Sequence, residues 1–442
     1  MNDSYDIIVI GAGPGGATAA LVAARAGLKV CVLEKAQHPK FHIGETLLPR
    51  LMGILDDLGL EPEMRKLPHV PKVGAEFCIG NDPRAMRFYF SQALAPTVPV
   101  FNIERAYFDK MLVDQARLAG AEVYENTAVK SILKLEENNV EVALDSGKQI
   151  KARMILDASG HGTVVGRHLG NRKNFTEEHL QKVAYFAHFE NVETSTADRH
   201  PTIFMCDEGW FWAIALNETK MSIGFVTRPS FVKDINVPPN KLLKWAMERC
   251  PQLQLRMKNA TGPDTNMVLA DFSYTCKPFA GPGYFLVGDA GCFLDPIFST
   301  GVTLAMYGGV EAARHTIGIF NGTQNPAKAR KTYSKMIAAS TAPFWKIIKN
   351  YYRKSFRDLF MEGQGPLQVH NAIFAVLAGH VFPKPAWKLR WRLQFFWFSM
   401  WLQDHFGVAP RRGVCSLMQE PPVAMPWVYE GATEPTMQPQ MA

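Results

Sequence analysis

The sequence predicts an α/β fold in which a Rossmann-type dinucleotide-binding lobe is interleaved with an antiparallel-sheet substrate lobe and followed by a helical C-terminal region. Three observations favour this fold. A short apolar run, Tyr5–Ile10, leads directly into a glycine-rich turn, as a buried parallel strand does. Residues 183–226 alternate strand-like runs with turn residues, which indicates a separate antiparallel sheet. Residues 302–360 are helical in character.

The N-terminal unit has the order strand, glycine turn, helix, strand. Ala17–Ala26 is a run of small residues that favours the helix, and Leu28–Leu33 favours a second strand that ends at Glu34. These lengths match a βαβ unit. The turn has the spacing G-x-G-x-x-G, with glycines at Gly11, Gly13 and Gly16.

Each of these glycines has a physical role in a dinucleotide site. Gly11 permits the tight turn, Gly13 lets the backbone approach a pyrophosphate, and Gly16 lets the helix pack closely on the strand. The pyrophosphate then lies at the helix N-terminus, where free amides and the helix dipole favour an anion. Glu34, followed by Lys35, lies 18 residues after Gly16, and its carboxylate can accept the ribose hydroxyls.

The organisation of the chain follows from these patterns. Residues 1–340 are expected to hold both lobes, interleaved, with the substrate sheet at approximately 183–275. Residues 341–423 are expected to form a helical region that covers the site. The last segment, 424–442, is rich in Pro, Met and Gln and is expected to be a loose tail. A further small sheet is predicted from strand-like runs over Val123–Leu144 and Gln149–Leu156.

Composition excludes several classes of protein. A hydrophobic content of 47% with 20% charged residues is that of a globular protein, and the net charge of +7 is too small and too dispersed for nucleic-acid binding. The seven cysteines are scattered, without paired spacing, which argues against a disulfide framework and a metal site. The N-terminus reaches a strand within a few residues and shows no signal peptide, so the cytoplasm is the expected location.

Two further elements favour FAD over NAD as the dinucleotide. Arg105–Asp109 resembles the RxxFD element of flavin monooxygenases, and Val287–Ala290, which contains Asp289, resembles the strand-end GD element that meets the flavin ribityl chain. Asp157–Gly160 resembles a third such element, although any single aspartate can be a helix cap. No second glycine triad occurs. Reduced flavin is therefore expected from a separate flavin reductase, unless nicotinamide binds only transiently.

Three segments make the resemblance more specific. Trp210–Ala215 matches the halogenase signature WxWxIP, except that Ala215 replaces the final proline. Gly288–Val302 resembles the D-P-[IV]-F-S-[ST]-G element, and Phe41–Pro49 resembles the GESLLP loop beside the flavin. The chain therefore resembles the flavin-dependent halogenases, in particular the shorter type that acts on phenols, pyrroles or carrier-tethered substrates. The resemblance extends over roughly residues 5–350.

The resemblance implies an activity and roles for particular residues. Reduced FAD (FADH2), dioxygen and chloride or bromide would give hypohalous acid, which halogenates an electron-rich aromatic acceptor, free or carrier-bound. Lys72, in Pro71–Ala75, would direct the halogen, either as an ammonium that hydrogen-bonds the acid or as an amine that forms a haloamine. The backbone of Thr300 and Gly301 would hold the halide. The residues expected to bind FAD are Gly11, Gly13, Gly16, Glu34, Lys35, Glu45, Thr46, Arg105, Asp289, Pro296 and Gly301.

Trp210 and Trp212 would form a wall between flavin and substrate, because side chains at i and i+2 of a strand share one face. Such a wall would force the reaction to proceed through a small diffusing oxidant. Core packing is the plain structural interpretation of the same pair. Because Ala215 replaces the proline of the signature, the protein could instead be a flavin monooxygenase or a prenyl (geranylgeranyl-type) reductase of the same fold. A third interpretation is a flavin-binding protein without turnover.

The aromatic segment 387–402 allows more than one interpretation. It is too short and too charged at one end to span a membrane. A helix that covers the substrate pocket is the first expectation, and a hydrophobic docking face or a peripheral membrane contact is the alternative.

Overall fold

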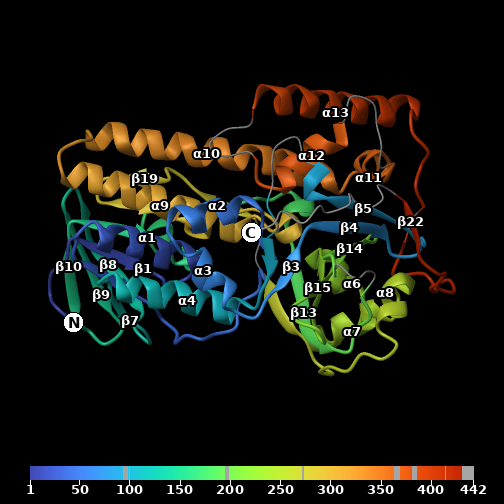
Figure 1. Ribbon diagram of the computed structural model, residues 1–442, viewed down its shortest axis with the longest axis horizontal. Helices are drawn as coiled ribbons and strands as arrows, with labels where there is room; N and C mark the ends of the chain where they lie inside the picture. Colours follow the sequence, from blue (N-terminus) through green and yellow to red (C-terminus); the bar gives the residue numbers. More distant parts are fainter. Residues whose placement is uncertain are drawn as a thin grey trace.

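The computed structural model describes residues 1–92, 98, 100–194, 199–270, 273–362, 369–380, 386–413 and 415–430. Two lobes lie side by side, each on its own sheet, and the C-terminal helices extend across one edge of both (Figure 1). The chain passes from the first lobe to the second and back again, so the lobes are interleaved as predicted.

The first lobe is built on a six-stranded sheet with the order β19-β20-β11-β1-β2-β7, in which only the edge strand β19 is antiparallel. Its strands are β1 (Ile7–Ile10), β2 (Val30–Leu33), β7 (Glu122–Tyr124), β11 (Met154–Asp157), β19 (Ala280–Gly281) and β20 (Tyr284–Leu286). The helices of this lobe are α1 (Pro14–Arg25), α4 (Arg105–Leu118) and α9 (Gly301–Phe320). Close contact between α1 and α9 depends on glycine, because a Cβ on Gly309 would lie 2.3 Å from the carbonyl oxygen of Gly15.

The small antiparallel sheet comprises β8 (Val129–Glu136), β9 (Asn139–Leu144) and β10 (Gln149–Ala152). One detail of the prediction is wrong here, because Gln149–Leu156 divides between two sheets. β10 alternates exposed and buried residues and pairs with β9, whereas β11 is buried at every position and joins the parallel sheet beside β1. A strand with both faces covered belongs in a parallel sheet between helices.

The second lobe is built on an eight-stranded sheet with the order β17-β13-β16-β15-β14-β4-β5-β22. Five of its strands lie in the predicted region: β13 (Val183–Glu190), β14 (Thr202–Met205), β15 (Gly209–Ala215), β16 (Lys220–Thr227) and β17 (Met267–Ala270). The other three come from elsewhere in the chain: β4 (Gly74–Ile79), β5 (Arg84–Tyr89) and β22 (Val428–Glu430). β4 pairs parallel with β14, and this pairing joins β4, β5 and β22 to the other five strands.

The tail differs from the prediction. β22 pairs parallel with β5, and Trp427, just before it, packs against Phe204 at a ring-centroid distance of 6.1 Å. The segment 424–430 is therefore tied to the substrate sheet by backbone hydrogen bonds and an aromatic contact, although its polar composition favoured a loose tail. Residues 431–442 lie outside the described part of the chain.

The C-terminal helices are α10 (Pro326–Tyr351), α11 (Lys354–Met361), α12 (Val369–Leu377) and α13 (Trp387–Phe406). α13 packs on α11 and α12 at the edge of the molecule (Figure 1). Within the described ranges, no helix is long and apolar enough to cross a membrane. The connecting elements are α2 (Arg50–Asp57), α3 (Glu61–Arg65), β3 (Val70–Lys72), β6 (Val100–Asn102), α5 (Val164–His168), β12 (Arg172–Asn174), α6 (Pro229–Asp234), α7 (Leu242–Met247), α8 (Pro251–Arg256), β18 (Tyr274–Cys276) and β21 (Cys292–Phe293).

Candidate active site

A cavity of about 580 Å³ is lined by residues of both lobes. Its size is that of an ordinary ligand site. The predicted site residues that line it are Gly11, Gly13, Glu34, Lys35, Glu45, Thr46, Lys72, Arg105, Trp210, Trp212, Asp289, Pro296, Thr300 and Gly301. Of the residues expected to bind FAD or halide or to act in catalysis, only Gly16 does not line the cavity. Among the described residues of 341–423, only Leu377 of α12 does, so α13 does not form part of the cavity wall.

The glycine turn at the start of α1 has the geometry that a dinucleotide requires. Gly11 has a φ of +95°, a conformation that L side chains rarely adopt. Gly13 is the N-cap of α1, and a Cβ there would meet no described atom within 4 Å, so its backbone faces open space in the cavity. A Cβ on Gly16 would lie 1.9 Å from the carbonyl oxygen of Gly11, so this position needs glycine for packing.

Glu34 directly follows β2, lines the cavity and is held by hydrogen bonds within the protein. One carboxylate oxygen accepts a hydrogen bond from the Ala12 amide at 2.8 Å. The other accepts from the Ala36 amide at 2.9 Å and from the Lys40 ammonium at 2.5 Å. Burial acts to raise the pKa of Glu34, but these hydrogen bonds outweigh it and lower the pKa, so the carboxylate stays ionised. Glu34 therefore also fixes the glycine turn.

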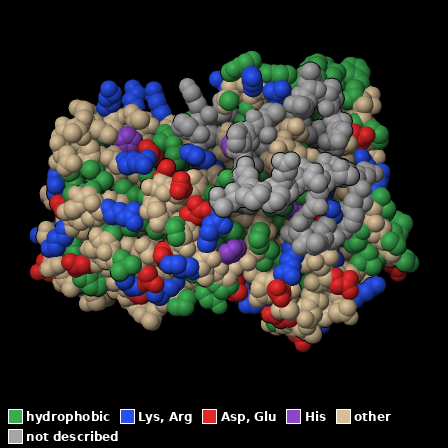
Figure 2. All heavy atoms as spheres, in the orientation of Figure 1, with side chains coloured by type: hydrophobic (Ala, Val, Ile, Leu, Met, Phe, Trp, Pro, Cys, Tyr) green, Lys and Arg blue, Asp and Glu red, His purple; other side chains and the backbone are tan. Residues whose placement is uncertain are grey.

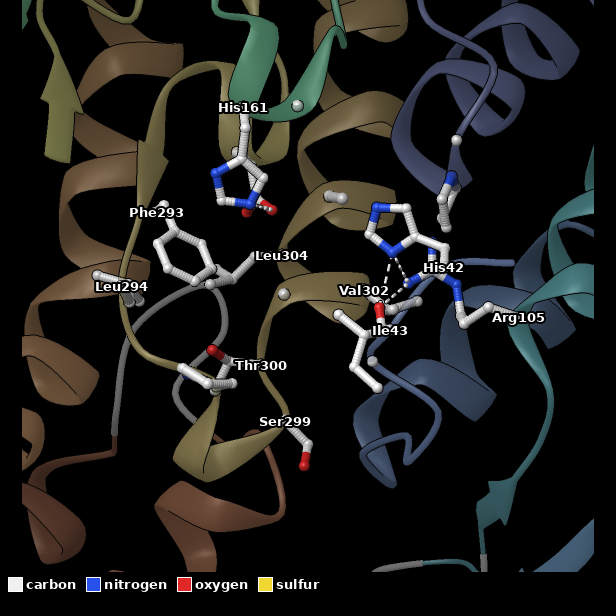
Figure 3. Close-up of a pocket in the computed structure, with 18 of the residues that line it drawn as sticks. His42, Ile43, Arg105, His161, Phe293, Leu294, Ser299, Thr300, Val302 and Leu304 are labelled. Carbon is white, nitrogen blue, oxygen red and sulfur yellow. Dashed lines mark hydrogen bonds and ion pairs between the residues drawn. The ribbon is translucent and has the colours of Figure 1, made fainter. Parts of the chain in front are cut away.

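The loop before α2 is held against both lobes. Gly44, with a φ of +105°, lets the loop approach the Arg105 guanidinium, which donates to the Ile43 carbonyl at 3.2 Å (Figure 3). Arg105 is itself oriented by a buried bidentate pair with Asp109, at 2.8 Å for each bond. The next two residues anchor the loop further. Glu45 lies 3.0 Å from His188 of β13, and Thr46 donates to the Asn102 side chain at 2.6 Å.

The two predicted aspartates have different roles. Asp157 accepts from the Ser159 and Val165 amides at 3.0 and 2.7 Å, so its carboxylate caps the turn that follows β11. It does not line the cavity. Asp289 does line the cavity, and its carboxylate lies 3.8 Å from His161. Of these two aspartates, only Asp289 lies in the cavity wall.

The N-terminus of α9 opens into the same cavity. Ser299 takes a φ of +55°, which turns the chain from the short 3-10 helix Pro296–Phe298 into α9. Thr300 is the N-cap, and its side chain makes no capping hydrogen bond. A Cβ on Gly301 would meet no described atom within 4 Å. Figure 3 shows Thr300 on one side of the cavity, with Ile43 and Arg105 on the other. Helix-end amides that face open space are suited to an anion.

Lys72 is buried at the end of β3, where its strand pairs with β6. The ammonium donates to the Leu47 carbonyl at 2.9 Å and lies 5.5 Å from the centre of the Phe90 ring. Burial lowers the pKa of the amine to about 7. Gly74 shapes this region, since a Cβ there would lie 2.0 Å from the Phe88 carbonyl oxygen and would separate β4 from β5.

Trp210 and Trp212 lie on one face of β15, both buried, with ring centroids 6.0 Å apart. Their indole N–H groups are satisfied, with Trp210 donating to the Tyr352 hydroxyl and Trp212 to the Ser222 hydroxyl, each at 3.1 Å. Gly224 of β16 makes room for Trp212, because a Cβ there would lie 2.2 Å from the indole ring.

The sequence did not predict the buried polar network that is hydrogen-bonded to Trp210. Tyr352, which holds Trp210, donates to the Asp295 carboxylate at 2.8 Å. The other carboxylate oxygen of Asp295 accepts from the Ile297 amide at 3.0 Å and caps the 3-10 helix that leads to Thr300. Lys182 lies 3.7 Å from the centre of the Tyr352 ring, and burial lowers its pKa to about 8, although Asp295 acts in the opposite direction. Asp295 thus links the tryptophan pair to the start of α9.

Fold and site together define a flavoprotein oxidoreductase with a Rossmann-type FAD lobe and a sheet-built substrate lobe. A profile described as tryptophan halogenase matches residues 6–99 and 80–360, and the chain belongs to this family. The predicted flavin-dependent halogenase family and fold are confirmed, and the monooxygenase and prenyl reductase alternatives are not favoured. The protein is an enzyme of the flavin-dependent halogenase class, which uses FAD with a halide.

Individual relatives support the same assignment. The chain is 31% identical over 397 residues to a 1H-pyrrole-2-carbonyl peptidyl-carrier-protein brominase of Pseudoalteromonas luteoviolacea, covering 87% of this chain and 94% of the relative. It is 28% identical over 382 residues to the corresponding chlorinase of Pseudomonas fluorescens, covering 80% and 85%. Among solved structures, the flavin-dependent brominase Bmp2 aligns with a TM-score of 0.80 at 28% identity, covering 91% of this chain and 99% of that one.

Proposed function

We propose that this protein transfers halogen from chloride or bromide to an electron-rich aromatic acceptor, with Lys72 as the residue that directs the halogen. The observation that carries the proposal is the position of Lys72: this buried lysine lines the cavity that is also lined by the glycine turn, the start of α9 and the tryptophan pair. A lysine buried without function would cost stability, because its ammonium loses hydration.

The residues of the first lobe fit FAD. Gly13 and the N-terminus of α1 would hold the pyrophosphate, and Glu34 with Lys35 would lie at the ribose. Glu45, Thr46, Arg105, Asp289 and Pro296 would surround the remainder of the cofactor. FAD in its reduced form supplies the electrons that activate dioxygen to oxidise the halide. Since the sequence has one glycine triad, we propose that a separate flavin reductase delivers the reduced cofactor.

Lys72 would then capture hypohalous acid before it diffuses into the protein. With a pKa near 7, much of the amine is neutral at physiological pH and can act as a nucleophile. The amine takes the halogen and releases water, and the haloamine passes the halogen to the aromatic carbon. The aromatic carbon loses its proton, and this proton returns to the amine nitrogen of Lys72. Trp210 and Trp212 would keep acceptor and flavin apart, because both rings are held by indole hydrogen bonds.

The side of the cavity near Lys72 fits an aromatic acceptor. Phe77, Phe88, Phe90 and Ile203 line it, and such side chains favour a flat apolar ring. Two relatives act on pyrrole-2-carbonyl groups tethered to a peptidyl carrier protein. We therefore propose a pyrrole or phenol acceptor, with a carrier-tethered acyl group as the first candidate. All seven cysteines are free and buried, which is consistent with action in the reducing cytoplasm.

The decisive experiment supplies reduced FAD, dioxygen and a panel of phenols, pyrroles and pyrrolyl-loaded carrier proteins, with chloride, with bromide or without halide. Mass spectrometry should show product only with halide, with the mass and isotope pattern of the halogen that was added. Oxygenated product that forms equally well without halide would refute the halogenase function.

Gly301→Ala is expected to raise the KM for halide about tenfold, as for the loss of one hydrogen bond to a charged group. The methyl group fits the fold, since it meets no described atom within 4 Å, and it would occupy the space next to the helix-end amides. Steady-state kinetics with varied bromide, alongside FAD titration by fluorescence, separate halide binding from cofactor binding. Gly413→Ala is the matched control, because its Cβ also meets open space. An unchanged halide KM would exclude Gly301 from the halide site.

A further inference from the structure

The outer face of α13 presents aromatic side chains that have no covering element among the described residues. Trp387, Trp391, Phe398 and Trp401 follow one another at spacings of four, seven and three residues, which place them on one face of the helix, and they are 70%, 37%, 52% and 48% exposed. Phe398 and Trp401 stack on each other, with ring centroids 5.9 Å apart. The opposite face is buried, with Phe396 packed edge-on against Phe356 of α11 at 5.5 Å. α13 is therefore apolar on both sides, and only its inner side is used by the fold.

Basic residues flank this aromatic face. Lys388 and Arg390 are exposed at the N-terminal end of α13. Its single acidic residue, Asp404, is neutralised by an ion pair with Arg353. α10 lies along the same edge and contains six Lys or Arg residues and no Asp or Glu. Lys346 joins the two helices, with its ammonium 5.0 Å from the centre of the Trp397 ring. Figures 1 and 2 show this edge, where hydrophobic side chains over α13 lie beside Lys and Arg side chains.

We propose that α13 lies on the surface of an anionic lipid bilayer, with its outer aromatic face at the level of the headgroups. Tryptophan and phenylalanine on an exposed helix face, flanked by lysine and arginine, are the composition of interfacial helices. The helix has 20 residues, so it offers a contact about 30 Å long parallel to the membrane plane. The basic edge of α10 and α13 complements anionic headgroups. A second copy of this chain would present the same basic edge and would be repelled, so a bilayer is the favoured partner.

One helix, α12, connects the aromatic surface of α13 to the cavity. α13 packs on α12, and Leu377 at the end of α12 lines the cavity. Phe374 of α12 also stacks on Phe88, a lining residue, with ring centroids 4.4 Å apart. Attachment through α13 would therefore place the acceptor side of the cavity near the membrane.

Vesicle flotation tests the proposal with the full-length protein and without halide or acceptor, so its outcome is independent of the halogenase function. Wild-type protein should float with phosphatidylcholine vesicles that also contain phosphatidylglycerol, and less with phosphatidylcholine alone. The variant Trp391→Ser/Phe398→Ser/Trp401→Ser should lower the partition coefficient at least about tenfold. The control Leu118→Ser/Leu133→Ser/Leu169→Ser removes three exposed apolar side chains elsewhere on the surface and should float like wild type.

Charge reversal tests the electrostatic part. Lys388→Glu/Arg390→Glu should lower binding to the anionic vesicles roughly tenfold or more and leave binding to phosphatidylcholine unchanged, whereas Lys241→Glu/Lys258→Glu, also exposed, should have little effect. Circular dichroism and FAD titration establish that each variant is folded. Absence of wild-type binding to anionic vesicles would overturn the proposal. So would unchanged binding by the triple aromatic variant, or a dimer in sedimentation velocity that this variant converts to monomer.

Discussion

Lys72→Met is expected to lower halogenated product per flavin oxidised roughly 10³-fold or more, while flavin binding and flavin oxidation remain close to wild type. The reason is geometric: Lys72 lines the cavity beside its aromatic side chains, and we propose that its amine holds the halogen there. Methionine fills a similar volume, so the cavity keeps its shape. Product is measured by mass spectrometry and flavin oxidation by absorbance under single-turnover conditions.

The same substitution should stabilise the fold, which separates lost chemistry from lost structure. The pKa of Lys72 is about 7 in the folded protein and 10.5 in its ordinary state, so below pH 7 the folded protein holds a buried charge. That cost is fully present below about pH 7 and disappears as the pH rises toward 10.5. Urea unfolding should therefore show Lys72→Met more stable than wild type at pH 6, with a difference that shrinks above pH 7.

Lys130→Met, at an exposed position, is the control and should change neither measurement. Halogenation by Lys72→Met at the wild-type yield would remove Lys72 from the mechanism.

Gly16→Ala is expected to destabilise the protein by about 3 kcal/mol and to abolish FAD binding, because the new methyl group would lie 1.9 Å from the Gly11 carbonyl oxygen. The backbone of β1 and α1 must then separate, and the N-terminus of α1 moves away from the cavity. Urea unfolding without added FAD, together with FAD titration, measures both effects.

Gly13→Ala is the matched comparison, since its methyl group meets no described atom within 4 Å. Its stability should equal that of wild type, whereas its FAD affinity should fall about tenfold, because the methyl group would occupy the proposed pyrophosphate position. Equal behaviour of the two variants would contradict the different roles assigned to these glycines.

The sequence allowed the prediction of features encoded by local patterns. The glycine spacing and the strand before it predicted α1 and the open turn at Gly13. Short motifs predicted Lys72, the tryptophan pair and the start of α9, and the structure brings all of them to one cavity. Their chemical roles remain proposals. The pattern of strand-like runs and turn residues also predicted β13–β16, because this pattern is local to each strand.

Features that depend on partners distant in the sequence could not be predicted. β4 joins the substrate sheet through β14, about 125 residues later, as the Cys78 to Ile203 contact shows. Tyr352 meets Asp295 across 57 residues and Trp210 across 142. α13 is apolar on both faces, so its pattern could not tell which face packs on α11 and α12. Strand β22 is too short to stand out from a polar tail.

The position of Asp295 restricts how this active site can be redesigned. One carboxylate orients Tyr352, and through it Trp210, while also capping the turn that leads to Thr300. The tryptophan motif and the turn before α9 therefore share a common anchor and cannot be exchanged as independent cassettes. A chimera that imports the tryptophan strand from another halogenase should work only when the residues at 295 and 352 are transferred with it. A mutational library should likewise vary positions 210, 295 and 352 jointly.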